Sequence, residues 1–278
     1  MCLQSEIFNP KWFAEGYQIM EKMLLKRVDI PNSTDIDVAM KNGAYSTLAT
    51  AFGMRPVDVM NEVKRANLRG RGGAGFPTGL KWELCSRVPG SLKYLLCNAD
   101  EGEPGTFKDR FILLQDPHLL IEGMVISSFA IGAERGYIYL RYEYPTALVV
   151  LEKAIEQAYA KGYLGKNILG KGVNFDLSVH RGAGAYICGE ETALIESLEG
   201  KRGQPRIRPP FPASQGAWRK PTVINNVETL SNIPYVIAMG ADAYAKIGEE
   251  TSPGPKLYGV SGMVNKPGVY ELPMGTTL

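Results

Sequence analysis

Apolar positions along the chain follow two patterns, one typical of helices and one typical of buried strands. Apolar residues at helical spacing, together with helix-starting residues, predict helices over 11–26, 45–52, 55–68, 118–133, 145–161, 192–198 and 227–239. Short apolar runs at 92–97, 136–141 and 175–180 are suited to buried strands. Two further runs, 256–262 and 269–272, flank Asn265-Lys266-Pro267-Gly268 and predict a hairpin.

The order of these elements predicts an α/β fold. Strands at 92–97, 136–141 and 175–180 alternate with helices long enough to be crossover connections, so the strands are expected to form a parallel sheet. Ligands of such sheets bind beyond the carboxyl ends of the strands. Two unusual loops fall there, one at 98–105 after Cys97 and one at 181–191 after His180.

A third loop, 70–82, carries five glycines together with Arg71 and Lys81. Backbone without side chains lets N–H groups approach a ligand, and the two cations favour a phosphate. The run Gly70-x-Gly72-x-x-Gly75 matches a dinucleotide fingerprint, but a helix at 55–68 precedes it where that fingerprint requires a strand. We therefore do not expect a standard Rossmann turn here, and a flexible surface connection is the alternative.

The other two loops have opposite chemical character. Residues 98–105 bring three carboxylates to the end of a strand, whereas 182–189 is a glycine-rich turn that meets a helix N-terminus, the usual anion cradle. Each candidate also has a structural interpretation. Glu190 and Glu191 could be first-turn helix residues, Asn225 and Asn226 could be turn and N-cap residues, and Phe211 could be a packing anchor among prolines.

Composition narrows the function by exclusion. The chain has 31 basic and 29 acidic residues and a net charge of +2, too little for a nucleic-acid-binding surface. Four cysteines lie far apart without a C-x-x-C pair, which argues against a disulfide framework and against a locally encoded zinc or iron–sulfur site. His118 and His180 have no paired partner in sequence and are expected to be structural. The chain offers no secretory h-region and no uncharged membrane span, so a cytoplasmic location is expected.

Four long motifs together resemble one known family. They are Gly70 to Trp82, Cys97 to Arg110, Gly182 to Ser197 and Pro221 to Leu230, and they occur in the family's order. On these motifs the chain is similar to the flavin- and NADH-binding subunit of bacterial NADH:quinone oxidoreductase (complex I). Related subunits are the diaphorases of NAD-linked hydrogenases and formate dehydrogenases. The resemblance covers most of the chain from about Gly43 onward.

The resemblance implies a Rossmann-like domain that binds FMN and NADH. Its division would be a helical segment at 1–54, the FMN/NADH-binding domain at 55–250, and the first hairpin of a β-grasp domain at 251–278. Carried over from the matching motifs, the residues expected to hold FMN are Gly70, Gly72, Lys81, Asn98, Asp100, Gly189, Glu190, Ile224, Asn225 and Asn226. The residues expected around NADH are Arg71, Gly73, Gly75, Phe76, Glu103, Glu191, Arg208 and Phe211.

Two departures from the family pattern qualify the resemblance. Leu84 stands where relatives often carry an aromatic residue, so one adenine-stacking surface is expected to be lost. The family continues into a helical bundle that binds a [4Fe–4S] cluster, and that part is missing from this sequence. The chain is then either a fragment or a protein that has lost its electron exit. A flavin-binding subunit without turnover is the alternative from a different class.

The expected chemistry is hydride transfer from NADH to FMN, with electrons passing to an iron–sulfur chain and on to quinone. Expected partners are a thioredoxin-like [2Fe–2S] subunit and the rest of a redox complex, which would hold the chain peripherally at the inner face of a membrane. Stacked rings need positioning more than an acid or a base, so no catalytic residue beyond the flavin is expected. Lys81 and Arg208 are assigned to phosphates, and Glu191 is expected to favour NADH over NADPH.

Overall fold

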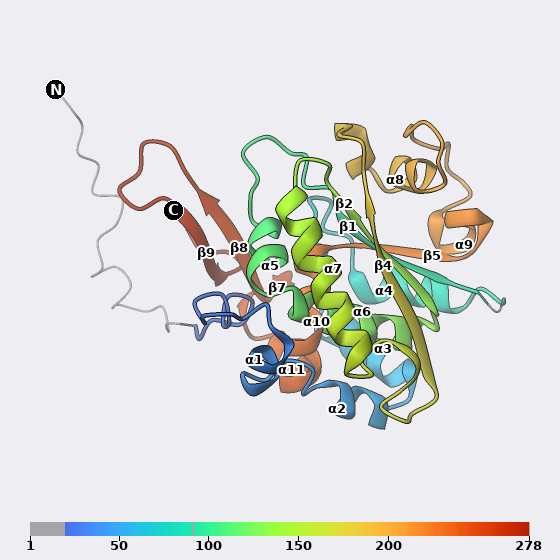
Figure 1. Cartoon of the computed structure of the whole chain (residues 1–278), viewed down its shortest axis with the longest axis horizontal. Coiled ribbons are helices and arrows are strands. Elements are labelled where there is room, and N and C mark those ends of the chain that lie inside the picture. Colours follow the sequence, from blue (N-terminus) through green and yellow to red (C-terminus); the bar gives the residue numbers. More distant parts are fainter. Residues whose placement is uncertain (1–19, 91, 278) are drawn as a thin grey trace.

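The computed structural model describes residues 20–90 and 92–277, which form a parallel-dominated α/β sheet covered by helices (Figure 1). The five-stranded sheet has the order β3-β4-β2-β1-β5. Its bounds are Tyr94–Ala99 for β1, Arg135–Leu140 for β2, Gly165–Ile168 for β3, Val173–Arg181 for β4 and Thr222–Asn226 for β5. Strands β4, β2, β1 and β5 are parallel, and β3 pairs antiparallel with β4 at the edge. The predicted α/β fold is confirmed.

Strand β1 is buried on both faces, which is why it appears in the sequence as a continuous apolar run. Side chains alternate along a strand, so Leu95 and Cys97 face one core while Tyr94 and Leu96 face the other. The same alternation places Asn98 on the side of Leu96. The sheet therefore carries a large core on one face and a smaller one on the opposite face.

The large core is formed by helices that follow or precede the strands. They are α1 (Ile36–Lys41), α2 (Leu48–Gly53), α3 (Pro56–Arg65), α4 (Thr78–Ser86), α5 (Asp109–Gln115), α6 (Pro117–Ile131), α7 (Pro145–Ala160), α10 (Val227–Met239) and α11 (Ala241–Tyr244). Asp116 caps α6 by accepting from the Leu119 N–H, Pro117 occupies the first turn, and Gly132 ends the helix at φ 73°. Local residues thus determine both ends of the most buried helix.

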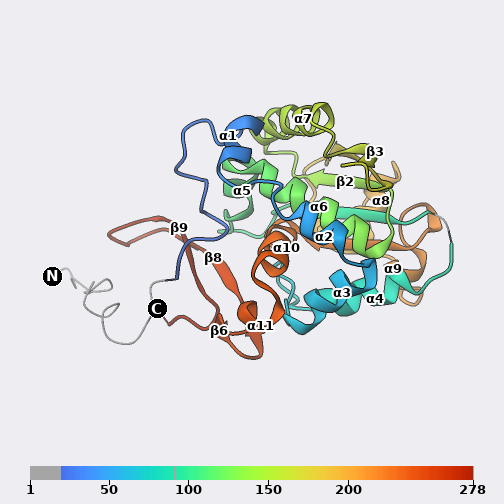
Figure 2. The same ribbon diagram turned by 90° about the horizontal axis from the view of Figure 1, so that it is seen from below.

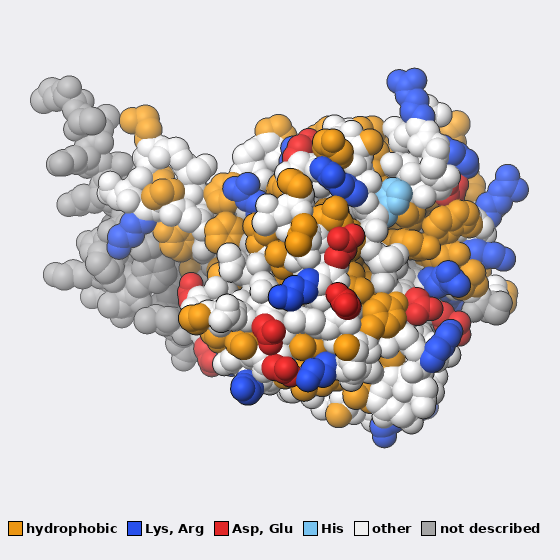
Figure 3. Space-filling view, viewed as in Figure 1, with side chains coloured by type: hydrophobic (Ala, Val, Ile, Leu, Met, Phe, Trp, Pro, Cys, Tyr) orange, Lys and Arg blue, Asp and Glu red, His pale blue; other side chains and the backbone are white. Residues whose placement is uncertain are grey.

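The opposite face carries the smaller core under η1 (Tyr186–Gly189) and α8 (Glu191–Leu198), next to α9 (Pro212–Gln215) and η2 (Ala217–Arg219). Short strands β6 (Gly248–Glu249) and β7 (Ser252–Pro253) lead to a hairpin of β8 (Pro255–Val260) and β9 (Gly268–Pro273). Figure 2 shows that this hairpin extends away from the sheet. In Figure 3 basic and acidic side chains are interspersed over the face shown, consistent with the small net charge. Among the described residues no helix has both the length and the apolar character needed to cross a membrane.

The N-terminal helix prediction is wrong where it can be checked. Residues 11–19 lie outside the described part, and residues 20–26 are irregular chain and turns. The reason is the Glu271 carboxylate of β9, which accepts the N–H groups of Met23, Leu24 and Leu25 at 2.9–3.0 Å. A distant side chain therefore binds the backbone groups that a helix would use internally. The predicted domain bounds at 54 and 250 stay predictions.

Gly123 allows α6 to pack directly on α10. A Cβ added at Gly123 would lie 2.1 Å from the carbonyl oxygen of Leu230, which is backbone and cannot rotate away. We expect Gly123→Ala to lower the free energy of unfolding by about 1–3 kcal/mol through overpacking, measured by urea denaturation. The control is Gly53→Ala in α2, where an added Cβ meets nothing within 4 Å. Equal stability of Gly123→Ala and Gly53→Ala would contradict this account of the contact between α6 and α10.

Candidate functional site

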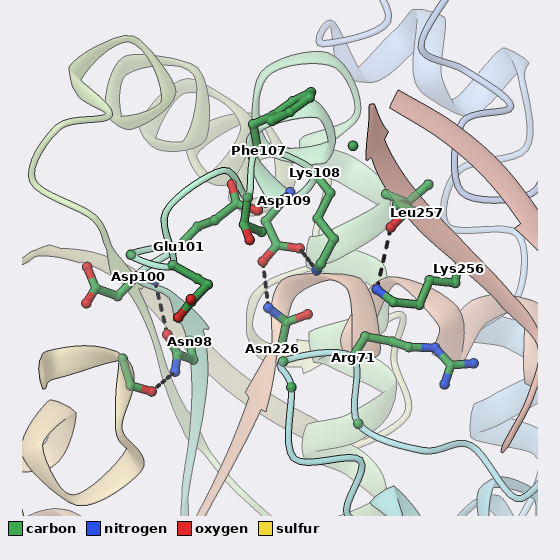
Figure 4. A pocket seen from close by; sticks show the side chains of 18 of the residues that line it. Arg71, Asn98, Asp100, Glu101, Phe107, Lys108, Asp109, Asn226, Lys256 and Leu257 are labelled. Atoms are coloured by element: carbon green, nitrogen blue, oxygen red, sulfur yellow. Dashed lines mark hydrogen bonds and ion pairs between the residues drawn. The ribbon is translucent and has the colours of Figure 1, made fainter. Parts of the chain in front are cut away.

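One cavity of about 790 Å³ lies beyond the carboxyl ends of the parallel strands. The loop after β1, the turn after β4 and the end of β5 all reach it, as expected for a parallel sheet. The glycine loop between α3 and α4 and strand β8 of the C-terminal hairpin complete its lining (Figure 4). The volume is within the range of small-molecule and cofactor sites.

The glycine loop is held at the cavity by its own backbone. The Gly70 N–H donates to the Phe76 carbonyl at 3.0 Å, and the Arg71 N–H donates to Thr229 Oγ1 in α10 at 2.8 Å. A Cβ at Gly72 would lie 3.1 Å from Cβ of Asn226, so a side chain there would press on the end of β5. The sequence placed this loop outside the sheet, yet it forms one wall of the same cavity as the other two loops.

Arg71 is buried beside this loop at 4% exposure. Its guanidinium donates to the Pro253 carbonyl at 2.6 Å and to Ser252 Oγ at 3.3 Å, and its Nε has no hydrogen-bond partner. Both acceptors are neutral, so the positive charge of Arg71 is not matched by an acidic contact at hydrogen-bond distance within the described residues. A buried guanidinium at a cavity wall favours an anionic ligand group.

Asn98, near the end of β1, and Asp100, in the acidic loop that follows it, both line the cavity (Figure 4). Asn98 donates to the Gly189 carbonyl at 2.8 Å and accepts from the Asp100 N–H at 3.1 Å. Burial raises the pKa of Asp100 to about 6, and its Oδ2 is buried without a hydrogen-bond partner. An unpaired buried acceptor at the cavity is suited to a ligand hydroxyl or N–H group.

The carboxylate of Glu101, unlike that of Asp100, is bonded to groups of the protein and holds the loop in place. Its carboxylate accepts the Asp109 N–H at 2.9 Å, the Arg110 N–H at 3.3 Å and the Tyr144 hydroxyl at 2.9 Å. Burial raises the pKa of Glu101, with nearby Asp109 adding to the effect. These bonds close the loop between β1 and α5.

The two adjacent glutamates at α8 differ in role. Glu190 is the N-cap, accepting the N–H groups of Thr192 and Ala193 at 2.9 Å each, and it also lines the cavity. Burial opposes its charge, but these bonds and Arg208 outweigh burial and lower the pKa of Glu190. Glu191 pairs with Lys81 Nζ at 3.0 Å and with Arg208 Nη1 at 3.3 Å. Glu191 is thus a first-turn residue of α8, as the structural interpretation expected, whereas Glu190 precedes the helix as its N-cap.

The two cations predicted to bind phosphates, Lys81 and Arg208, both pair with these glutamates, and their role toward a phosphate stays a prediction. Lys81 donates to the Ile224 carbonyl at 3.1 Å as well as to Glu191, and Arg208 contacts both Glu190 and Glu191. Neither is among the residues that line the cavity. The cations that do line it are Arg71, Lys108 and Lys256, and the last two were not predicted.

Asn225 and Asn226 point in different directions because they are neighbours on β5. Asn225 accepts from Trp82 Nε1 at 2.9 Å in the buried contact with α4. Asn226 caps α10 through the Glu228 N–H at 2.9 Å, donates to Asp109 at 2.6 Å and lines the cavity. Only the second amide is at the cavity, and Ile224 packs in the smaller core beneath α8.

Some of the remaining predicted residues line the cavity and others lie outside its lining. Gly70, Gly72, Gly189, Gly73, Gly75 and Glu103 line the cavity with those already described. Phe76 and Phe211 are exposed at 44% and 57% and lie outside its lining, with Lys81 Nζ 5.9 Å from the Phe76 ring centroid. Leu84 is likewise exposed.

Sequence reasoning missed several lining residues, among them Tyr186, Lys108, Asp109 and Lys256. Tyr186 donates to Glu103 at 2.5 Å, joining the two loops. Three of these four residues lie within the motifs 97–110 and 182–197. The adjacent charged residues Lys108 and Asp109 were therefore the feature of the sequence that could have indicated them.

His118 and the three described cysteines are buried, whereas His180 is partly exposed. His118 is buried, 2.8 Å from the Tyr45 hydroxyl, and burial lowers its pKa to about 4. Cys85, Cys97 and Cys188 are buried and free, and Cys2 lies outside the described residues. Within 20–90 and 92–277 no cluster of His, Cys, Asp and Glu could hold a metal ion.

Taken together, a glycine-rich loop, an acidic loop and a helix N-terminus around one cavity define an α/β protein of the nucleotide-cofactor-binding class. A comparison with known protein families identifies the family. A family model described as the Nuo51 FMN-binding domain matches residues 63–235, and the chain belongs to this family.

Similar proteins come from two kinds of redox complex. The chain is 59% identical to an NADH-quinone oxidoreductase subunit of Aquifex aeolicus over 92% of this chain and 60% of that protein. It is 57% identical to the corresponding Escherichia coli subunit over 85% and 54%, and 51% identical to an NADP-reducing hydrogenase subunit of Solidesulfovibrio fructosivorans over 89% and 50%. The chain thus spans 50–60% of the length of these three relatives.

A solved structure supports the fold. The NAD⁺-reducing [NiFe]-hydrogenase in its H₂-reduced state contains a chain that is 42% identical, with a TM-score of 0.79. The similarity covers 98% of this chain and 45% of that chain. The fold described above is therefore shared with a chain of a hydrogenase.

Proposed function

We propose that this chain is the FMN- and NADH-binding module of an NADH-oxidising flavoprotein. The observation that carries the proposal is the cavity at the sheet edge, with the partnerless Asp100 Oδ2 on one side and the buried, partnerless Arg71 Nε near the glycine loop on the other. FMN has a polyol chain that needs acceptors and a phosphate that needs donors. The residues present fit the cofactor.

The residues divide that work between polar and charged groups. Asp100 would accept from the cofactor's hydroxyl groups, Asn98 would accept from or donate to them, and Arg71 with the N–H groups of the glycine loop would bind its phosphate. When bound, FMN accepts a hydride from NADH and passes electrons on singly. The chain supplies position and shielding from water, and Glu103 and Tyr186 link two loops at the cavity.

The electron acceptor would be supplied by other subunits. Quinone as the final acceptor matches the names of the NADH-quinone oxidoreductase relatives. The proposal adds an iron–sulfur chain leading to quinone, a thioredoxin-like [2Fe–2S] subunit as the direct partner, and peripheral attachment to a membrane. A diaphorase role in an NAD-linked hydrogenase is the second candidate. It is favoured by the hydrogenase subunit at 51% identity and the hydrogenase structure at 42%.

The direct test is retention of FMN by the 278-residue chain. Gel filtration after incubation with FMN should give a protein peak with the flavin spectrum at close to one equivalent. A chain that elutes folded, by circular dichroism, and free of flavin would overturn the proposed function.

We expect Glu191 to discriminate against NADPH. Its carboxylate pairs with Lys81 and Arg208, so its removal would both end repulsion of a 2′-phosphate and free two cations to bind one. Glu191→Gln should raise the ratio of kcat/KM for NADPH to that for NADH by roughly tenfold, equivalent to about 1.4 kcal/mol. The control is Glu152→Gln on the exposed face of α7. An unchanged ratio would remove Glu191 from this role.

A further inference from the structure

Glu228 is a wholly buried carboxylate, with 0% side-chain exposure, in the first turn of α10. Its Oε1 accepts the backbone N–H of Leu257 in β8 at 2.8 Å. Its Oε2 lies 2.7 Å from Lys108 Nζ and 3.5 Å from Lys256 Nζ. One side chain therefore contacts the hairpin backbone and two cations of the cavity lining.

Lys108 is equally constrained. Its Nζ contacts Asp109 Oδ1 at 2.6 Å as well as Glu228, and Asp109 in turn accepts from Asn226 at 2.6 Å (Figure 4). Burial alone would lower the pKa of Lys108, but Asp109 and Glu228 outweigh burial and the pKa is raised. Lys108 is thus held as a buried ammonium group between two carboxylates.

Lys256 lies in the same wall of the cavity, but its positive charge is less well compensated by carboxylates than that of Lys108. Burial lowers the pKa of Lys256, and although Glu228 opposes this shift, Lys108 and Arg71 add to it. Three cations, Arg71, Lys108 and Lys256, therefore share one side of the cavity, with Glu228 compensating two of them. The carboxylates facing the group are Asp109, next to Lys108, and Glu101, which binds the Asp109 N–H.

We propose that Glu228 is a positioning residue that ties strand β8 to the cofactor cavity and sets the charge of the cavity wall by pairing with Lys108. The inference rests on the proposed function for its second half, because the charge acts on bound FMN. The first half, the tether from Glu228 to the Leu257 N–H, concerns the chain alone. No other buried carboxylate within the described residues joins α10 to the hairpin by a bond to the β8 backbone.

Three variants separate the two roles of Glu228, the hydrogen bond to the Leu257 N–H and the negative charge beside Lys108. Glu228→Gln keeps an oxygen for the Leu257 N–H and removes the negative charge, whereas Glu228→Ala removes both. Glu228→Gln with Lys108→Met removes one charge of each sign and so restores the balance of the wall. The matched control is Glu250→Gln, an exposed carboxylate on the same C-terminal segment.

The tether is tested by hydrogen exchange, which needs no cofactor. The Leu257 amide should exchange at least roughly tenfold faster in Glu228→Ala and within about threefold of the unmodified chain in Glu228→Gln, because a lost buried hydrogen bond permits local opening. Glu250→Gln should not change it. Unchanged exchange in Glu228→Ala would overturn the tether.

The charge is tested by the midpoint potential of bound FMN. Added net positive charge in the wall of the cavity favours the reduced, more negative form of a cofactor bound there. Glu228→Gln should therefore shift the equilibrium toward reduced cofactor by about tenfold, which is about 30 mV for a two-electron couple. The double variant should return to the potential of the unmodified chain. A potential that the second substitution does not restore would overturn the charge role, whereas an unmodified chain that retains no FMN would overturn the proposed function instead.

Discussion

Asp100→Ala is expected to weaken FMN binding by one to two orders of magnitude. The Asp100 carboxylate lies in the cavity lining with a buried oxygen that has no partner in the protein, so a ligand hydroxyl group is its expected donor. Hydrogen bonds to charged groups contribute about 1.5–3 kcal/mol, which corresponds to roughly 10- to 150-fold in affinity. Quenching of FMN fluorescence at about pH 7.5, well above the pKa of about 6, measures the dissociation constant.

Two further variants test whether the effect belongs to this carboxylate. Asp100→Asn keeps an acceptor oxygen and should lose less affinity than Asp100→Ala. Asp242→Ala, which removes an exposed carboxylate at the start of α11, should leave the dissociation constant unchanged. Equal affinity of Asp100→Ala and the unmodified chain would mean that Asp100 makes no bond to the cofactor.

Arg27→Met is expected to cause the largest loss of stability among single substitutions in the N-terminal segment. Arg27 and Asp116 are exposed at 4% and 1%, with Arg27 Nη2 donating to Asp116 Oδ1 at 3.0 Å. Removing one member of a buried pair leaves an uncompensated charge and costs about 3–5 kcal/mol. Urea denaturation at pH 7 measures the difference in the free energy of unfolding.

The double variant Arg27→Met with Asp116→Asn isolates the unpaired charge, because asparagine can still cap α6. It should recover most of the loss. Burial raises the pKa of Asp116, and Arg27 partly offsets this effect. In Arg27→Met the offset is lost, so Asp116 binds a proton more readily in the folded state than in the unfolded state. The stability deficit should therefore narrow as pH falls from 7 to 5. A deficit that persists in the double variant would assign the effect to lost packing.

Local patterns were enough to predict the core of the fold. The N-cap and proline at the start of α6 and the apolar runs of β1, β2 and β4 indicate their elements without any long-range information. Strand β3 was missed because Gly165-Lys166-Asn167-Ile168 is short and polar, as an edge strand can be. The irregular chain at 20–26 was missed because it depends on Glu271, which lies 248 residues from Met23 in the sequence.

The site was predicted less completely, for two physical reasons. Neighbours on a strand face opposite sides, so Asn225 and Asn226 cannot both reach the cavity, and sequence alone does not say which does. Ion pairing is also invisible in the sequence. Lys81 and Arg208 bring positive charge, but Glu190 and Glu191 bind it, whereas Lys256 reaches the cavity only because the hairpin folds back onto α10.

The measurement that tests the central claim most directly is the absorbance spectrum of the FMN-loaded chain under argon before and after one equivalent of NADH. We expect loss of the oxidised flavin band, because the proposed function brings FMN and NADH into contact within this chain. Retained FMN whose band does not change on addition of NADH would contradict the proposed hydride transfer. That result would favour a flavin-binding subunit without turnover.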